Sequence, residues 1–178
     1  MADRITPADV AALMANPSVE TQQQIAARVA GMFAAEGFSE SEQQVAEDVL
    51  RAMVSRTAES VRQALSEHLR QTPMLPRDVA LALARDVDSV ALPILESSPA
   101  LCDADLIEIV QSASEDRQVA IARRPSVSET VSEALVDRGS ARVVTTLVNN
   151  GGARLDEQTL HKVVQAFPDD ASVQEGLV

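Results

Sequence analysis

Apolar residues recur at helical spacing along nearly the whole chain. In the middle of the sequence, Val87, Val90, Ala91, Ile94 and Leu95 occupy positions i, i+3, i+4, i+7 and i+8, which together form one face of an α-helix. No segment shows sustained alternation of apolar and polar residues, so the pattern predicts an all-α protein without a sheet. The same spacing recurs in four later segments: Leu106, Ile107 and Val110; Val127, Val131 and Leu135; Val143, Val144, Leu147 and Val148; and Leu160, Val163, Val164 and Phe167.

The N-terminal part of the chain predicts longer helices than the rest. After a short predicted helix over residues 7–15, apolar stripes predict amphipathic helices between Pro17 and Pro73, the first of which ends at Gly37. Their stripes are Ile25, Val29 and Phe33; Val45, Val49, Leu50 and Met53; and Val61, Ala64, Leu65 and Leu69. We therefore expect residues 1–72 to form a bundle-like region, followed by shorter helices over residues 73–178.

Prolines mark the change between these two parts. Pro73 and Pro76 interrupt the helical pattern just before the shorter helices begin. Pro93 lies inside the stripe that starts at Val87, and a proline removes one backbone hydrogen bond from a helix. The sequence therefore predicts that this helix is kinked at Pro93 or begins later than Asp88.

The shorter helices contain an internal repeat. Residues 77–95 can be laid over residues 117–135 at an offset of 40 without a gap. The matched pairs are Arg77 with Arg117, Val79 with Val119, Ala80 with Ala120, Leu81 with Ile121, Ala82 with Ala122, Val87 with Val127, Ala91 with Val131, and Leu95 with Leu135. A period of about 20–50 residues is typical of a solenoid, in which each unit buries its apolar face against its neighbours. The pattern therefore predicts an α-solenoid over residues 73–178.

A second repeat register is also visible, at an offset of 54. In this register the matched pairs are Leu106 with Leu160, Val110 with Val164, Gln111 with Gln165, and Val119 with Val173. Val178 then corresponds to Arg124, so the chain stops inside a repeat. Because solenoids normally finish with an atypical polar repeat, we expect these 178 residues to be a fragment of a longer protein.

The segment from Arg77 to Leu95 resembles a repeat of the HEAT and armadillo class. It contains a helix, a turn with aspartates, and a second helix with the pattern valine-x-x-proline-x-leucine. The resemblance implies that the turn aspartate, Asp86 or Asp88, caps neighbouring helices. Residues from about 60 to 178 are also similar to an uncharacterised bacterial domain family built of such helical repeats, with matching segments at 87–101, 120–124, 127–135 and 143–153. That family has no assigned activity, so the resemblance implies a fold and no chemistry.

Composition narrows the range of partners and compartments. The net charge is −12, and nucleic-acid affinity depends largely on lysine and arginine contacts with phosphates, so we expect neither nucleic acid nor an anionic membrane as a partner. A protein with a basic patch would be attracted, although acidity alone also keeps a protein soluble. The single cysteine, Cys102, and the lack of an apolar signal segment after Met1 predict a cytoplasmic protein.

The reactive side chains form no catalytic or metal-binding pattern in the sequence. His68 precedes Leu69 and Arg70 as in a histidine-kinase phosphoacceptor box, but the order of residues differs and a helix residue beside a proline stop is the simpler interpretation. His161 and Cys102 lie far from His68, without metal-ligand spacing. The run from Asn149 to Gly152 follows a helix and predicts a helix stop rather than a phosphate loop. We expect no cofactor, no metal and no enzymatic activity.

The densest basic group is formed by Arg117, Arg123 and Arg124. These arginines are candidates for anchoring a carboxylate or phosphate of a partner. The alternative is an internal ion pair with a repeat acid, namely Asp86, Glu115 or Asp137.

These observations favour a non-catalytic scaffold or adaptor that binds other proteins on the surface of a helical-repeat solenoid. One alternative is a regulatory module that forms a homodimer through the N-terminal helices. The other is a small-ligand binder whose pocket lies on the concave face of the solenoid.

Overall fold

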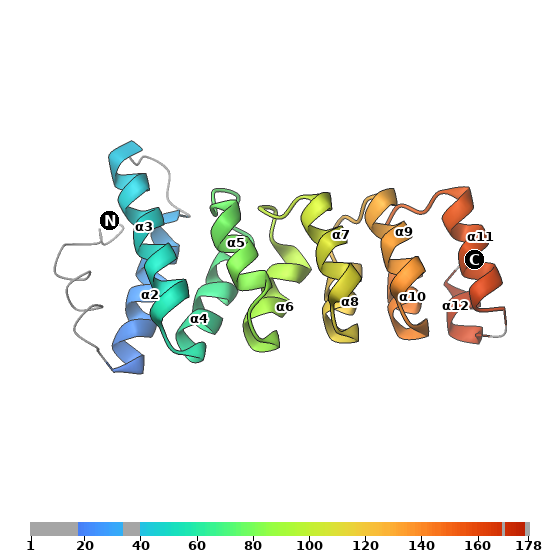
Figure 1. Ribbon diagram of the computed structural model, residues 1–178, viewed down its shortest axis with the longest axis horizontal. Coiled ribbons are helices and arrows are strands. Elements are labelled where there is room, and N and C mark those ends of the chain that lie inside the picture. The colour runs from blue at the N-terminus through green and yellow to red at the C-terminus, as the bar shows by residue number, and fades with distance from the viewer. Residues whose placement is uncertain (1–17, 34–39, 169, 177–178) are drawn as a thin grey trace. The chain divides into compact units, whose positions relative to one another are not determined.

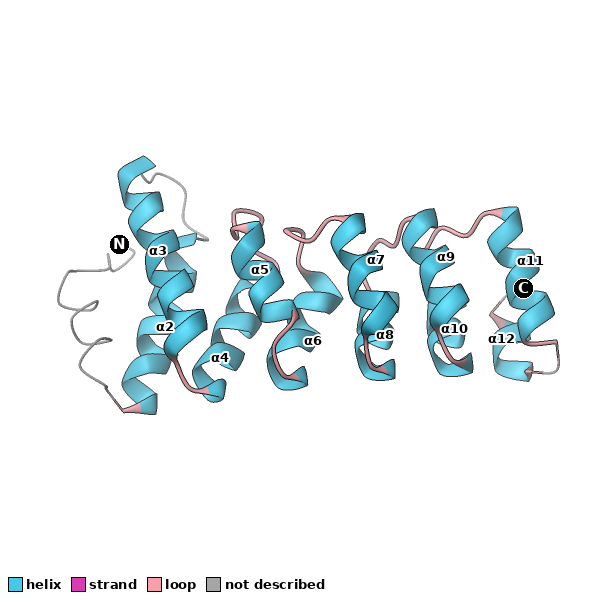
Figure 2. Cartoon of the chain, viewed as in Figure 1, coloured by secondary structure: helices cyan, strands magenta, loops and turns pink. Residues whose placement is uncertain are grey.

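Helices make up the secondary structure of the described chain. The computed structural model describes residues 18–33, 40–168 and 170–176, and within these ranges there are helices and one isolated β-bridge but no strand (Figures 1 and 2). The all-α prediction is therefore confirmed. The predicted helix over residues 7–15 and the predicted stop at Gly37 lie outside the described residues.

The described helices divide into two compact units. Unit 1 contains the described residues up to Ile94 together with Ser98–Ala100, and unit 2 contains Leu95–Ser97 and the described residues from Leu101 onward. The division therefore passes through α6 (Asp88–Ser97). The change in helix organisation between residues 72 and 73 stays a prediction.

Unit 1 is built on the predicted N-terminal stripes. Its other described helices are α2 (Val19–Phe33), α3 (Glu40–Arg56), α4 (Glu59–Leu69) and α5 (Arg77–Ala84). α2 packs against α3 and α4, and α3 packs against α5. The fully buried residues include Val29, Leu50, Val61, Leu65 and Leu69, all of which the helical periodicity placed on inward faces.

The predicted apolar stripe of α3 is wrong at one position. Val45 is 56% exposed, whereas Ala46, Val49, Leu50 and Met53 are buried. These four residues follow the i, i+3, i+4, i+7 spacing of one helix face, and Val45 lies just outside the edge of that face, about 100° around the helix from Ala46. The inward face of α3 therefore begins at Ala46.

The start of α6 also differs from the prediction. The helix begins at Asp88, and Pro93 lies inside it. The carbonyl of Val87 accepts hydrogen bonds from the amides of Val90 and Ala91, each at 2.9 Å, so the first turn is complete before the chain reaches Pro93. Of the two predicted alternatives, the later start is therefore wrong, because the proline removes only a bond further along the helix, and the kink at Pro93 stays a prediction.

Unit 2 contains two rows of helices. Its helices are α7 (Asp103–Ser112), α8 (Glu115–Ala122), α9 (Glu129–Arg138), α10 (Ala141–Val148), α11 (Glu157–Ala166) and α12 (Ala171–Glu175). α9 packs against α7 and α11, and α10 packs against α8 and α12. We call α7, α9 and α11 the long row and α8, α10 and α12 the short row. The core between them includes Ile121, Leu135, Val144, Leu147 and Val163, which are fully buried.

The helix boundaries explain one of the two repeat registers. α9 begins 26 residues after α7, and α11 begins 28 residues after α9. The offset of 54 therefore relates α7 to α11, two helix pairs further along. The offset of 40 relates α5 to α8 and α6 to α9, but it equates an exposed residue, Val87, with a buried one, Val127. Similarity at this offset therefore does not mean equivalent burial.

Ser132 on α9 is a buried polar residue that leads to a stability prediction. Its side chain is fully buried, and its hydroxyl has no hydrogen-bond partner. A buried hydroxyl without a partner has lost its hydrogen bonds to water. We expect Ser132→Ala to raise the free energy of unfolding by about 1 kcal/mol, measured by urea denaturation. A clear loss of stability would show that the hydroxyl is satisfied after all.

Candidate interaction surface

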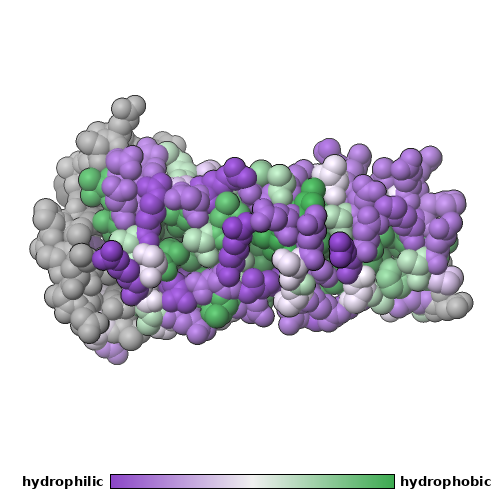
Figure 3. Space-filling view, in the orientation of Figure 1, coloured by the Kyte–Doolittle hydropathy of each residue, from purple (hydrophilic) through white to green (hydrophobic). Residues whose placement is uncertain are grey.

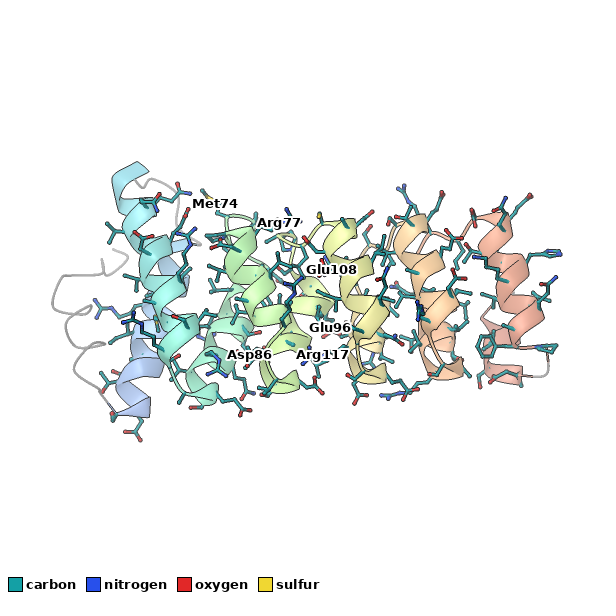
Figure 4. All side chains as sticks on the ribbon, viewed as in Figure 1. Met74, Arg77, Asp86, Glu96, Glu108 and Arg117 are labelled. Atoms are coloured by element: carbon teal, nitrogen blue, oxygen red, sulfur yellow. The ribbon has the colours of Figure 1, made fainter. Side chains whose placement is uncertain are left out.

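The structure separates the three arginines that the sequence grouped. Arg123 is exposed at the end of α8, whereas Arg117 is half-buried on the same helix and is engaged in an interaction within the fold. Figure 4 shows Arg117 in the region of Glu96 and Glu108, all of which belong to unit 2. Arg124 is only 8% exposed. The three side chains therefore do not present one common basic surface.

Arg124 binds the main chain inside unit 2. Its Nη1 donates a hydrogen bond of 2.7 Å to the carbonyl oxygen of Leu95, in the last turn of α6. Burial lowers the pKa of the guanidinium, because removing a cation from water disfavours its charged form. The sequence led to two interpretations of this arginine, as an anchor for a binding partner or as a member of an internal ion pair. Neither interpretation included a hydrogen bond to a backbone carbonyl.

Asn150 occupies the equivalent place one helix pair later. α8 ends at Ala122 and α10 ends at Val148, so Arg124 and Asn150 are each the second residue after a short-row helix. The side-chain amide of Asn150 donates hydrogen bonds to the carbonyls of Ala122 (2.7 Å) and Arg124 (2.8 Å). Both side chains thus donate hydrogen bonds to the preceding helix pair, where they satisfy carbonyl groups at or near the end of a helix.

The two loops that follow these helices are also joined through their backbones. The amide of Val127 donates to the carbonyl of Gly152 (3.1 Å), and the amide of Arg154 donates to the carbonyl of Val127 (3.0 Å). The side-chain oxygen of Asn150 accepts a hydrogen bond from the amide of Gly152 (2.9 Å). The run from Asn149 to Gly152 therefore ends α10, as predicted. It also forms hydrogen bonds that join the loop after α10 to the loop after α8.

Two cations of unit 2 are each held by a pair of carboxylates. Arg142 of α10 contacts Asp116 (2.7 Å) and Glu115 (3.2 Å) of α8. Lys162 of α11 contacts Glu133 (2.8 Å) and Asp137 (2.9 Å) of α9. We call these groups the Arg142 clamp and the Lys162 clamp. In each clamp the acids lie on the preceding helix of the same row.

The clamps leave the surface of unit 2 anionic. Each combines one positive with two negative charges, so its net charge is −1. Figure 3 shows hydrophilic side chains over much of the visible face of α9 and α11. Further carboxylates are exposed where the long-row helices begin, at Asp103, Glu129 and Glu157. We call these three residues the acidic row. Acids in the first turn also complement the helix dipole.

The Arg142 clamp predicts a pH-dependent contribution to stability. The pKa of Glu115 is held below its usual value by a hydrogen bond from the Ser140 hydroxyl and by Arg142. A carboxylate with a lowered pKa in the folded state stabilises the fold above its unfolded pKa, and this contribution is lost as the pH falls through the folded value. We expect the melting temperature of the wild type to exceed that of Glu115→Gln at pH 7 and the difference to shrink as the pH falls below the ordinary pKa of a glutamate and through the lowered folded value. A difference that is independent of pH would contradict this explanation.

In unit 1 a short ion pair joins α4 to the turn between α5 and α6. Arg62 binds Asp86 through Nε (2.5 Å) and Nη2 (2.9 Å), and both side chains are largely buried. Asp86, which is labelled in Figure 4, also accepts a hydrogen bond from the amide of Val87 (2.8 Å), the N-cap residue of α6. Asp86 thus links α4 to the start of α6, whereas the helix-capping role that the resemblance implied for Asp86 or Asp88 stays a prediction, because no side chain caps α6.

Unit 1 also contains an open groove of about 330 Å³ between α3 and α5. Its lining residues are Arg51, Val54, Ser55, Asp78, Val79, Ala82 and Asp86. Arg51 bridges Asp78 of α5 (2.7 Å) and Glu47 of its own helix (3.1 Å), and it lowers the pKa of Asp78. The guanidinium in this groove is therefore already paired with carboxylates.

The reactive side chains singled out in the sequence lie apart from one another. His68 is exposed near the end of α4, His161 is exposed on α11, and the exposed Cys102 is the N-cap residue of α7. The thiol of Cys102 donates to the carboxylate of Asp105 (3.1 Å). Within the described ranges, no three or more His, Cys, Asp or Glu residues are grouped so that they could hold a metal ion. None of the described helices is long and apolar enough to cross a membrane.

These features define an all-α protein with recurring helix pairs, loops that bind the preceding helix pair, and an acidic surface. The model of a family described as "Uncharacterised protein conserved in bacteria (DUF2336)" matches residues 90–178, which is half of the chain. The chain therefore belongs to this bacterial family, as the sequence resemblance predicted. The comparisons with curated proteins and with solved structures gave no match.

Proposed function

We propose that this chain is a non-catalytic protein-interaction scaffold whose helix pairs form a HEAT/armadillo-like solenoid. The proposal is supported by the recurrence of one long and one short helix at nearly constant spacing in unit 2. Contacts between successive helices of each row, and side chains that reach back from one pair to the preceding one, are typical of repeats that are stabilised by their neighbours.

The observation that supports the choice of partner is the pairing of two cations of unit 2, Arg142 and Lys162, with carboxylates. Arg142 and Lys162 are each neutralised by two carboxylates, while the acidic row remains exposed. Neighbouring packed helices are typically about 8–10 Å apart, so the acidic row presents negative charges at regular intervals. A protein segment with lysines or arginines at a similar spacing complements such a surface, and the net charge of −12 speeds its approach. The same charge disfavours duplex DNA.

Affinity capture with matched charge variants tests this proposal. The wild type, Asp103→Asn/Glu129→Gln and the control Glu20→Gln/Glu67→Gln are each used as bait in a lysate of the source organism. Both variants remove two negative charges, but the control changes exposed residues of unit 1. We expect the wild type and the control to retain the same protein in stoichiometric amount, and the acidic-row variant to retain clearly less.

The same experiment distinguishes the proposal from its alternatives. Added salt should release the partner, because exposed charge pairs are screened. Failure of every bait to retain a protein, or equal retention by all three, would contradict the proposed surface. Binding of duplex DNA at physiological salt would contradict the argument from charge.

A further inference from the structure

The groove of unit 1 lies between one side of α3 and one side of α5. Arg51 and Ser55 are one turn apart on α3, and Asp78 and Ala82 are one turn apart on α5. The two helices pack against each other. The apolar side chains of the lining are those of Val54, Val79 and Ala82. The groove therefore offers an apolar surface next to charged groups.

The cation of the groove is fully engaged by acids. The Nε of Arg51 donates to Asp78 (2.7 Å), its Nη1 donates to Asp48 (3.1 Å) and its Nη2 donates to Glu47 (3.1 Å). One positive charge therefore faces three negative charges, and the group carries a net charge of −2. An anionic occupant would have to displace one of these carboxylates from the guanidinium, and it would be repelled by the others.

The two aspartates of the lining differ in what they offer to an occupant. The side chain of Asp86 is 14% exposed, and it already binds Arg62 through two hydrogen bonds. The side chain of Asp78 is 60% exposed. A carboxylate can accept about four hydrogen bonds, so Asp78 has capacity beyond its contact with Arg51. The accessible negative charge of the groove is therefore that of Asp78.

The lining also indicates which kind of cation suits the groove. A metal ion does not fit, because no three acids, histidines or cysteines within the described ranges are grouped to hold one. Lysine and arginine side chains combine an aliphatic stem with a charged head, so they match an apolar surface that ends at a carboxylate.

We propose that the groove between α3 and α5 binds a lysine or arginine side chain of a protein segment, with its stem against Val54, Val79 and Ala82 and its charged head at Asp78. The site is made of unit 1 residues and shares none with the acidic row of unit 2. It therefore does not depend on the partner binding proposed above.

Nuclear magnetic resonance titration of the full chain with three short peptides tests the chemistry of the occupant. Each capped peptide holds one central residue between glycines: lysine, norleucine, which keeps the stem without the charge, or glutamate. We expect the lysine peptide to shift the backbone amides of Ser55, Val79 and Ala82 saturably, with a dissociation constant of about 1–10 mM. No saturation by about 50 mM of this peptide, or equal binding of either other peptide, would overturn the proposal.

A matched pair of charge variants separates direct contact from long-range attraction. Asp78→Asn and Asp48→Asn each remove one carboxylate that binds Arg51, but only Asp78 lines the groove. We expect Asp78→Asn to raise the dissociation constant of the lysine peptide by about fivefold or more, and Asp48→Asn to raise it by less than about twofold. Equal effects would mean that net charge alone attracts the peptide, and would overturn the assignment.

A second pair of variants tests the place of the aliphatic stem without changing any charge. Ala82→Leu and Ala52→Leu each enlarge an exposed alanine of unit 1, but only Ala82 lines the groove. We expect Ala82→Leu to raise the dissociation constant of the lysine peptide by about fivefold or more and Ala52→Leu to leave it unchanged. Circular dichroism shows whether each variant has formed its helices. Unchanged binding by folded Ala82→Leu would place the peptide outside the groove and overturn the proposal.

Discussion

Gly152→Ala is expected to lower the free energy of unfolding by about 3 kcal/mol. A Cβ atom at this position would collide with the carbonyl oxygen of Pro125, which is backbone and cannot move aside as a flexible side chain can. The carbonyl of Gly152 also accepts the hydrogen bond from Val127, and its amide donates to Asn150. Making room for a methyl group would therefore separate the two loops that this glycine joins.

Gly151→Ala is the matched control for this prediction. A Cβ atom at Gly151 would meet no other atom within 4 Å. We expect this variant to keep the stability of the wild type, measured by urea denaturation followed by circular dichroism. If both alanine variants were equally stable, close approach of the two loops could not be the reason for glycine at position 152.

Arg124→Ala is expected to lower the free energy of unfolding by about 2–3 kcal/mol. The substitution removes the hydrogen bond to the carbonyl of Leu95 and leaves that buried acceptor without this partner. It also leaves a space where a long, nearly buried side chain had packed.

The neighbouring Arg123→Ala separates the structural effect from the change in charge. Both substitutions remove one positive charge, but Arg123 is exposed. We expect its stability to stay within about 0.5 kcal/mol of the wild type, as is usual for surface substitutions. Equal destabilisation by the two variants would show that net charge, rather than the contact with Leu95, determines the effect.

Helical periodicity predicted most of the described helices and most of their buried faces, but it gave no stripe for α5, α8 or α12. Val61, Leu65 and Leu69 of α4 illustrate this, since a stripe with spacing of four residues became fully buried. The stripe of α3 was predicted one residue too early at Val45, because an apolar residue beside a stripe has the same sequence signal as one within it. Pro93 does not prevent α6 from starting at Asp88, because the hydrogen bonds from Val90 and Ala91 to Val87 form before the chain reaches the proline. The residue types alone do not show these bonds.

The polar contacts between helix pairs could not be predicted in the same way. Arg124 was interpreted as a partner of carboxylates or of another protein, because its neighbours in the sequence are arginines. The structure shows a hydrogen bond from Arg124 to the carbonyl of Leu95, 29 residues away in the chain, which the neighbouring residues in the sequence do not indicate. Asn150 was interpreted only as part of a helix stop, although its amide binds two carbonyls of the preceding loop and helix. Arg124 and Asn150 share one feature in the sequence, since each is the second residue after a helix of the short row. This feature can be recognised only once the ends of those helices are known.

The ion pairs of unit 2 also could not be predicted from the sequence. The net charge predicted an acidic surface, but the sequence did not indicate which cations are neutralised. Lys162 pairs with two acids of α9 that are one helical turn apart, and Arg142 pairs with two consecutive acids of α8. These pairings depend on the packing of helices within each row, which a charge count does not contain. They reduce the basic surface available to an anionic partner and strengthen the argument for a basic one.

The most direct test of the central claim is a calorimetric titration of the captured partner with the wild type, the acidic-row variant Asp103→Asn/Glu129→Gln and the control Glu20→Gln/Glu67→Gln. The proposed scaffold predicts saturable binding by the wild type and the control at one stoichiometry, and a dissociation constant raised by about fivefold or more for the acidic-row variant. Identical isotherms for all three proteins, or no heat of binding to a purified protein partner, would contradict it.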